Sequence, residues 1–266
     1  MFIYVLVLVA TLVLMFMLKN CDNGHRTGNT PVQQHTGTDT IHVAIEYSPL
    51  SLYTYNDTLG GFNYDMLRLI ARKNNVRLKF YPVVTLSKSL AELKEGRYDI
   101  VVSDIPKTTE YQDSFLFTEP IYLDRQVLVQ LKDSISGKCR INTPLELAGD
   151  TVWVVAGSPF AGRIANLARE IGDTIYTVEE PIYASEQLFL MVATGEIKQA
   201  VINERVAELL AREYPSVDIS TSISFTQFQP WVVNSRDKEL CDSLNKWIDS
   251  IKGTPVYKSL EKRYFR

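Results

Sequence analysis

The alternation of strand and helix patterns after residue 40 constrains the fold of this chain more than any other feature. Apolar runs of strand length alternate with amphipathic stretches of helix length, in two successive sets. The expected strands are 41–45, 77–81, 98–102 and 126–131, then 151–155, 174–178 and 199–202. The expected helices are 64–73 and 86–96, then 160–171, 186–193 and 204–213. Strands separated by helices of about ten residues are typical of parallel sheets with helices on both faces. The sequence therefore predicts an α/β protein with two such units.

The C-terminal part of the chain predicts a strand and two helices that have no sheet of their own. The strand is expected at 228–233 and the helices at 238–251 and 255–264. This segment must pack on a sheet that is formed elsewhere in the chain. Open parallel sheets bind ligands at the carboxyl ends of their strands. Two such sheets that face each other across a cleft would hold a small solute.

The N-terminal segment predicts export of the remaining chain. Residues 2–18 are apolar or nearly so, and the first charged side chain is Lys19. A segment that is apolar on every face is typical of an export or membrane segment. Three interpretations stay open. The first is a cleaved signal, for which the small residues at a cleavage site are missing. The second is a lipoprotein signal that would make Cys21 the acylated N-terminus, and the third is an uncleaved anchor. We expect a periplasmic protein that is tethered to the membrane through residues 1–21.

Residues 22–40 are predicted to be a flexible linker, because they are polar, contain Gly, Pro and Thr, and lack apolar periodicity. The net charge of −3 provides no basic excess for binding nucleic acid. Cys21, Cys139 and Cys241 are too far apart in sequence for a metal-binding motif. The sequence therefore predicts neither a metal site nor a cofactor, and we expect Cys139 and Cys241 to remain unpaired.

Several short motifs occur in order along the chain. They are Tyr-Ser-Pro-Leu at 47–50, Gly-Phe-Asn-Tyr-Asp-Met at 61–66, Leu-Lys-Glu-Gly-Arg-Tyr-Asp at 93–99, Phe-Thr-Glu-Pro-Ile-Tyr at 117–122 and Thr-Pro-Leu-Glu-Leu at 143–147. Each is weak alone, but in this order they resemble the landmarks of the periplasmic solute-binding proteins of the amino-acid-binding type, family 3. The resemblance runs from about Ile41 to Tyr264, which is nearly all of the exported chain.

The resemblance implies a two-lobed periplasmic-binding-protein fold of type II, in which two doubly wound sheets are joined by a two-strand hinge. Lobe one would comprise residues 41–129 and 225–266, and lobe two residues 130–224. The hinge strands would lie near Gln130 and Ser224. In this arrangement the C-terminal segment finds its sheet in lobe one.

Within this family, the chain also resembles the non-catalytic domain of the membrane-bound lytic transglycosylases F. The segments that carry this resemblance are 48–50, 205–215, 229–231 and 260–264. Those enzymes have a lysozyme-like catalytic domain after this point, whereas the present sequence ends at Arg266. We therefore expect a protein that is not an enzyme.

The resemblance also implies candidate ligand-binding residues in lobe one. In the amino-acid binders of the family, a Ser-x-Thr-x-x-Arg stretch before the Phe-Ser-x-Pro motif holds the ligand's α-carboxylate through the arginine. Here Thr108 occupies the threonine place and Tyr111 the arginine place. A phenol offers one neutral hydrogen bond and does not neutralise a carboxylate. We therefore expect weak binding of ordinary free amino acids.

Further candidates lie at the ends of expected strands, and each has a structural alternative. Asp104 would suit an ammonium or a hydroxyl-rich ligand, or would cap a turn. The backbone N–H groups of Gly157 and Ser158 would hold an anion, or would form a plain strand–helix turn. Glu204 lies near the place of the family's ammonium acceptor, or would serve the helix dipole. Tyr47 and Tyr53 would stack on the ligand, or would belong to the core.

Three functional hypotheses follow. The first is a binding protein that captures a small ligand, such as an amino-acid-like compound, a peptide or a cell-wall fragment, for transport through an inner-membrane permease or for sensing. The second is a regulatory protein that binds cell-wall fragments and acts on a separately encoded transglycosylase. The third is a dehydratase-like enzyme on the same fold, in which Asp104 or Glu204 would act as the general acid.

Overall fold

The computed structural model describes residues 40–103 and 105–265. The apolar segment, Cys21, the linker before Thr40 and Asp104 lie outside these residues. The described residues all belong to one compact unit of the chain, Gly37–Arg266. In that part of the chain, no helix is long and apolar enough to cross a membrane.

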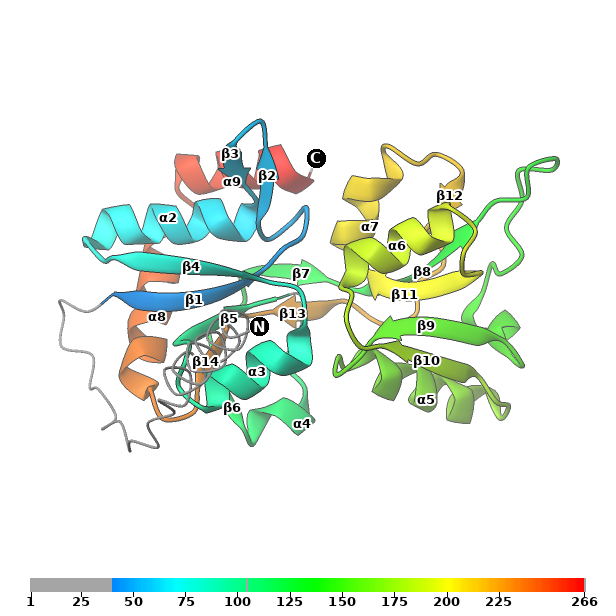
Figure 1. Cartoon of the computed structure of the whole chain (residues 1–266), viewed down its shortest axis with the longest axis horizontal. Helices are drawn as coiled ribbons and strands as arrows, with labels where there is room; N and C mark the ends of the chain where they lie inside the picture. The colour runs from blue at the N-terminus through cyan, green and yellow to red at the C-terminus, as the bar shows by residue number, and fades with distance from the viewer. Residues whose placement is uncertain (1–39, 104, 266) are drawn as a thin grey trace, which may run out of the picture. The chain divides into compact units, whose positions relative to one another are not determined.

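Lobe one is built on a five-stranded sheet with the order β4-β1-β5-β14-β6 (Figure 1). Its strands are β1 (Ile41–Glu46), β4 (Leu78–Val83), β5 (Ile100–Val102), β6 (Phe115–Phe117) and β14 (Val232–Asn234). Strand β1 is parallel to β4 and β5, whereas β14 is antiparallel to β5 and β6. The C-terminal strand β14 thus completes the sheet formed by the N-terminal half.

Both faces of this sheet are covered by helices, because alternate strand residues point to opposite faces. Val43 and Ile45 pack in one cluster with residues of α2 (Phe62–Asn74), α8 (Lys238–Ile251) and α9 (Pro255–Phe265). Ala44 packs in another cluster, with leucines of α3 (Leu86–Lys94). The short helix α4 (Thr109–Gln112) follows on the α3 side, next to β6. A hairpin of β2 (Tyr53–Tyr55) and β3 (Thr58–Gly60) precedes α2.

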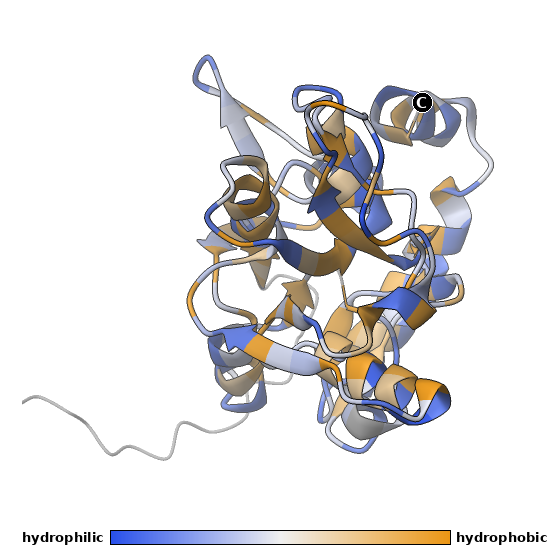
Figure 2. Ribbon diagram, turned by 90° about the vertical axis from the view of Figure 1, so that its right-hand side faces the viewer, coloured by the Kyte–Doolittle hydropathy of each residue, from blue (hydrophilic) through white to orange (hydrophobic). Residues whose placement is uncertain are grey.

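Lobe two repeats this plan with a five-stranded sheet of order β10-β9-β11-β8-β12. Its strands are β8 (Gln126–Leu131), β9 (Thr151–Val155), β10 (Tyr176–Glu180), β11 (Gln199–Asn203) and β12 (Val217–Asp218), and a 3₁₀ helix, η1 (Pro144–Leu147), leads into β9. Its helices are α5 (Phe160–Ile171) on one face, and α6 (Ser185–Ala193) and α7 (Glu204–Ala211) on the other. Figure 2, which views the molecule from the side of lobe two, shows hydrophobic segments in strands and helices that each also carry hydrophilic residues. That pattern is typical of a sheet between amphipathic helices.

The sequence predicted parallel sheets, whereas both five-stranded sheets are mixed. β14 is antiparallel to its neighbours in lobe one, and β8 is antiparallel to β11 and β12 in lobe two. The expected strand 228–233 is also interrupted at Pro230 and Trp231, which separate β13 (Gln227–Gln229) from β14. Proline has no N–H to donate to a sheet ladder. The break therefore lets β13 and β14 belong to different sheets.

A two-stranded ribbon carries the chain between the lobes. It consists of β7 (Tyr122–Asp124) and β13, paired antiparallel with Gln227 opposite Asp124. The predicted lobe boundary placed residues 126–129 in lobe one. In the structure, β8 pairs with β11 in the sheet of lobe two from Gln126 onward. Every residue of β8 up to Gln130 is buried. Strand β8 runs without a break through the predicted boundary between residues 129 and 130.

Candidate functional site

A cleft lies where strands of both lobes end. Lobe one contributes Glu46 and Val83, the last residues of β1 and β4, and Ser103, which follows β5. Lobe two contributes Val155, the last residue of β9, and Ser185, the first residue of α6. Carboxyl ends of parallel strands are where open α/β sheets bind ligands, so this cleft is the candidate site.

Its walls are mainly apolar, and its one charged lining residue in the described part of the chain is Glu46. Glu46 is 8% exposed, and its carboxylate accepts a hydrogen bond from the Ser103 hydroxyl. The remaining polar lining residues are Ser89, Ser158 and Ser185. Ser89 donates to the Thr85 carbonyl at 2.8 Å and Ser158 to the Val155 carbonyl at 2.5 Å. These two serines therefore offer a ligand mainly acceptor lone pairs.

Contacts between the lobes lie near the cleft. The Tyr111 hydroxyl, on α4, donates to the carbonyl of Gly157, in the turn between β9 and α5. Gly157 has φ +71°, and a Cβ atom at this position would lie 3.1 Å from the Cβ of Ser87 on α3. The Thr85 hydroxyl also approaches the Ile182 carbonyl to 3.5 Å. Lobe-to-lobe contacts therefore place two predicted residues, Tyr111 and Gly157, against each other.

The turn at Gly157 uses its own N–H groups internally. The Gly157 N–H donates to the Glu179 carboxylate at 3.3 Å, and the Ser158 N–H to the Val155 carbonyl at 3.2 Å. The Phe160 N–H donates to the Ser158 hydroxyl at 3.4 Å, and Pro159 has no N–H. An anion would compete here with existing acceptors, one of which is itself negatively charged.

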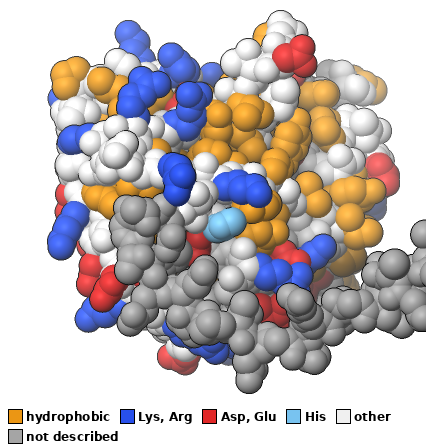
Figure 3. Space-filling view, turned by 60° about the vertical axis from the view of Figure 1, so that its left-hand side comes forward, with side chains coloured by type: hydrophobic (Ala, Val, Ile, Leu, Met, Phe, Trp, Pro, Cys, Tyr) orange, Lys and Arg blue, Asp and Glu red, His pale blue; other side chains and the backbone are white. Residues whose placement is uncertain are grey.

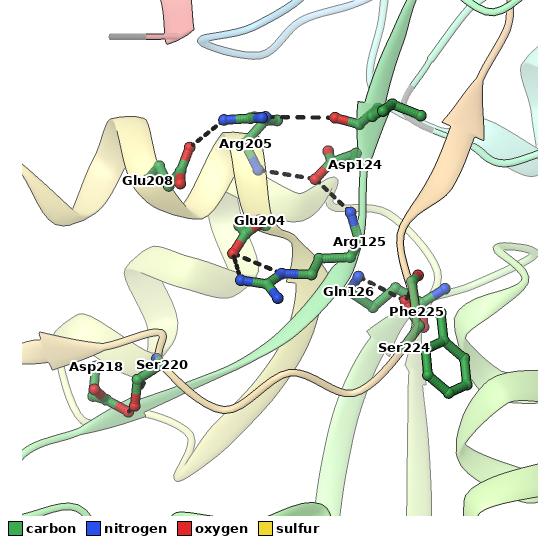
Figure 4. Close-up of polar contacts among 11 residues, drawn as sticks. Asp124, Arg125, Gln126, Glu204, Arg205, Glu208, Asp218, Ser220, Ser224 and Phe225 are labelled. Atoms are coloured by element: carbon green, nitrogen blue, oxygen red, sulfur yellow. Dashed lines mark hydrogen bonds and ion pairs between the residues drawn. The ribbon is translucent and has the colours of Figure 1, made fainter.

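Glu204 lies next to the hinge, and it is not among the residues that line the cleft (Figure 4). Its carboxylate accepts hydrogen bonds from Nε and Nη2 of Arg125 at 2.8 and 2.5 Å, and its N–H donates to the Arg125 carbonyl at 2.8 Å. This ion pair raises the pKa of the Arg125 guanidinium. The neighbouring Asp124 is buried, and burial raises the pKa of its carboxyl group to about 7.

The remaining predicted residues are also absent from the described lining of the cleft. Thr108 precedes α4, and its hydroxyl is buried without a hydrogen-bond partner among the described residues. Tyr47 directly follows β1 and is exposed. The Tyr53 ring covers Gly60, where a Cβ atom would lie 2.9 Å from the ring. Of the candidates from the sequence, Ser158 alone both lines the cleft and lies within the described residues.

Comparison with known proteins shows what kind of protein this fold and cleft belong to. The bacterial extracellular solute-binding proteins, family 3, match the chain over residues 40–266. The chain belongs to this family. This confirms the resemblance inferred from the ordered motifs.

Two relatives and one solved structure show how widely the similarity of this family 3 protein extends. The membrane-bound lytic murein transglycosylase F of Desulfosudis oleivorans is 28% identical over 85% of the chain and 48% of the relative. The probable histidine-binding protein of Campylobacter jejuni is 24% identical over 92% of the chain and 90% of the relative. An ancestral arginine-binding protein bound to arginine superimposes with a TM-score of 0.75 at 22% identity, covering 87% of this chain and 100% of that one.

These comparisons confirm the type II periplasmic-binding-protein fold and the similarity to lytic transglycosylase F. The chain spans about half the length of the transglycosylase relatives that it matches. At 22% identity, the likeness to the arginine-binding protein shows the fold alone.

Sequence reasoning missed Glu46, Ser103 and Ser185, which supply most of the polar lining of this family 3 protein's cleft. One signal was present: Glu46 is a charged residue at the end of an otherwise apolar strand. Ser103 directly follows the apolar strand β5. Only the pairing of β1 with β5 brings these two side chains together.

No group of three or more His, Cys, Asp or Glu side chains suited to a metal ion occurs within residues 40–103 and 105–265. Cys139 and Cys241 are both free thiols. Burial raises the pKa of each of these thiols, which makes both poor nucleophiles near neutral pH.

Figure 3 shows Lys and Arg side chains in several places on the lobe-one face, with hydrophobic side chains exposed between them.

Proposed function

We propose that this chain is an exported, membrane-tethered solute-binding protein that captures a small ligand in the cleft between its lobes, for transport or for sensing. The observation that carries the proposal is a cleft at the carboxyl ends of strands from both lobes, whose one charged side chain among the described residues is Glu46. Membership of an extracellular solute-binding family supports the exported location. Neither observation requires a catalytic step.

The composition of the cleft favours a ligand with hydrogen-bond donors and an apolar body. Glu46 would accept from an ammonium or hydroxyl group, and the serine hydroxyls would accept further donors. Among the described lining residues no lysine or arginine is present to pair with a carboxylate. A hydrogen bond to a charged group contributes about 1.5–3 kcal/mol. An ordinary α-amino acid that loses such a bond would bind about ten- to a hundredfold more weakly.

The similarity to the transglycosylases suggests a cell-wall fragment or a peptide as the ligand class. The chain matches about half of those proteins. We propose two partners on this basis: an inner-membrane permease if the protein serves transport, and a separately encoded transglycosylase if it is regulatory. Stimulation of a purified transglycosylase by this protein plus a muropeptide would support the second role, and no change in its rate would remove it.

Isothermal calorimetry against the common amino acids, short peptides and muropeptides tests the ligand class. We expect weak or no binding of free amino acids and measurable binding of a larger ligand with ammonium or hydroxyl groups. Glu46→Gln should weaken that binding by about ten- to a hundredfold. Glu239→Gln makes the same change on the exposed surface of α8 and should leave affinity unchanged. Micromolar binding of a free amino acid would contradict the proposed ligand class.

Tyr111→Arg tests the predicted place of the family's carboxylate clamp. If Tyr111 occupies that place, the variant should gain affinity for free amino acids, because the guanidinium supplies a bidentate partner for a carboxylate. An unchanged amino-acid affinity in a normally folded variant would show that Tyr111 lies outside the clamp.

Cell fractionation tests the tether. The intact chain should remain with the membranes after a high-salt wash. Release from the membrane in Cys21→Ala alone would favour a lipoprotein over an uncleaved anchor. Recovery of the unaltered chain as soluble periplasmic protein would contradict tethering.

A further inference from the structure

The ribbon that connects the lobes carries polar side chains beside Tyr122 on its buried face, and apolar side chains on its exposed face. Asp124 on β7 and Gln229 on β13 are each 2% exposed. Their neighbours Leu123 and Phe228 are 48% and 61% exposed. The hydrophobic effect favours the opposite arrangement, with apolar side chains buried and polar side chains exposed. The buried polar face therefore requires a specific explanation.

Several oxygen atoms on this ribbon and at the start of β8 are buried without a hydrogen-bond donor among the described residues. They are Oδ2 of Asp124 and the Oε1 atoms of Gln126, Gln227 and Gln229. Asp124 and Gln227 are directly opposite in the antiparallel ribbon, so their Cβ atoms lie on one face, about 4.5–5.5 Å apart. Gln229 follows two residues along β13 and shares that face. Buried acceptors without a donor are destabilising.

We propose that Asp124 is a proton-binding site in the hinge, where the protonated Oδ2 donates a hydrogen bond to the side-chain oxygen of a hinge glutamine, Gln227 being its partner by register. The proton comes from solvent and converts one of the two facing acceptors into a donor. The other carboxyl oxygen, Oδ1, keeps its own donors, the N–H groups of Arg125 at 2.8 Å and of Arg205 at 3.2 Å.

The charged groups around Asp124 are engaged with other partners (Figure 4). Between β7 and β8, the Arg125 guanidinium binds Glu204. On α7, the Arg205 guanidinium binds Glu208 at 3.0 Å and approaches the Leu123 carbonyl at 3.5 Å. Strand β13 contributes only Gln and Phe.

These surroundings decide the pKa of Asp124. Burial is the largest influence and raises the pKa, the N–H groups and the Arg205 charge oppose it, and Glu204 raises it further. With a pKa of about 7, the Asp124 carboxyl group is neutral over much of the acidic pH range.

A proton at this position would link three elements. Asp124 ends β7, its Oδ1 holds the N-terminus of α7 in lobe two, and its Oδ2 faces β13, the returning strand of the hinge. When the proton leaves, the bond to β13 is lost and a buried charge remains. Ionisation should therefore favour arrangements of the hinge that admit water to Asp124.

The sign of the effect on stability follows from linkage. An aspartate in the unfolded chain has a pKa of about 3.9, whereas Asp124 in the folded chain has a pKa of about 7. The folded state therefore binds more protons between these values. The contribution of Asp124 to stability is greatest below about pH 4, declines as pH rises, and levels off above about pH 7.

Asp124→Asn in the full-length chain tests this inference. Asparagine has nearly the same shape, accepts at its oxygen and donates permanently from its amide, so it imitates the protonated acid. The melting temperature of the variant, relative to the wild type, should rise as pH increases from about 4 to about 7. Asp249→Asn removes one negative charge from the exposed surface of α8 and serves as the matched control.

Infrared spectroscopy provides a second measurement that does not depend on stability. Below neutral pH, the wild type should show a protonated carboxyl band that Asp124→Asn lacks and Asp249→Asn retains. Absence of this band, together with a pH-independent difference in melting temperature, would overturn the proposal. Asp124 would then be ionised, and a glutamine side-chain amide turned to donate would supply its hydrogen bond. Loss of the band on addition of sodium or calcium at fixed pH would also overturn it, in favour of a bound cation.

Discussion

Glu46 and Asp124 are both buried carboxyl groups at the ends of strands, yet they have different surroundings. Glu46 ends β1, accepts a hydrogen bond from the hydroxyl of Ser103 and lines the cleft between the lobes. Asp124 ends β7, accepts backbone N–H groups of Arg125 and Arg205, and faces glutamine oxygens across the hinge ribbon. The first carboxyl group adjoins space in which a ligand could bind, whereas the second is enclosed by the protein itself. Burial alone therefore does not identify a ligand-binding acid.

This difference between the two carboxyl groups predicts a separation of effects. Changes on the hinge side should alter stability or the coupling between elements, whereas changes on the cleft side should alter ligand affinity. Variants at the hinge and at the cleft can test whether the effects on stability and on affinity are separate.

Trp231→Ala should have the largest effect, and the effect should be on stability. Trp231 separates β13 from β14, is 1% exposed, and donates from its indole N–H to Asn63 at 3.0 Å. Truncation of a buried Trp to Ala costs about 3–5 kcal/mol, and here it also leaves the Asn63 oxygen without this donor. Urea unfolding measures the loss. Trp247→Ala, at a partly exposed position on α8, should cost less. Equal losses would contradict the larger contribution that burial and the Asn63 hydrogen bond predict for Trp231.

Gly157→Ala should have an intermediate effect and should separate backbone strain from the contact between lobes. A left-handed backbone conformation costs a non-glycine residue about 1–2 kcal/mol. Gly149, also in lobe two, has φ +78°, and a Cβ added there would have no atom within 4 Å, whereas a Cβ at Gly157 would meet Ser87. Gly149→Ala should therefore show the strain alone. Hydrogen exchange at the start of α3 should increase only in Gly157→Ala; equal exchange in both variants would contradict the lobe contact.

Removal of the Arg125–Glu204 ion pair should have the smallest effect. The side chains are 41% and 18% exposed, and ion pairs with this much access to solvent contribute about 0.2–1 kcal/mol. A double-mutant cycle with Arg125→Ala and Glu204→Ala, measured by urea unfolding, should give a coupling free energy in that range. Neither variant should change ligand affinity. A tenfold loss of ligand affinity in Glu204→Ala would show that Glu204 contributes to the binding site, and it would contradict the separation of hinge and cleft effects.

The longer elements could be predicted from sequence because their patterns are local. The bounds expected for α5 and α8 agree with the structure at both ends, and so do those of β9. In each helix, apolar side chains recur on one face over several turns. The strands β2, β3, β6 and β7 were not predicted, since three residues are too few to establish a period.

The site was less accessible to prediction than the fold. Gly157 and Ser158 were identified because a turn between a strand and a helix is visible in sequence. The partners of Glu46 and Glu204 were not, since Ser103 and Arg125 lie 57 and 79 residues away along the chain. Their pairing depends on which strands lie side by side.

The sequence by itself determined the α/β class, the two units and the family, because hydrophobic periodicity and ordered motifs are properties of neighbouring residues. The tertiary structure alone decided that β14 and β8 run antiparallel to their neighbours, that Glu46 lines the cleft, and that Asp124 is enclosed in the hinge. The environment of a carboxyl group is set by burial and by donors within a few ångströms. In this chain those donors come from residues that are distant in sequence and meet only when the sheets form.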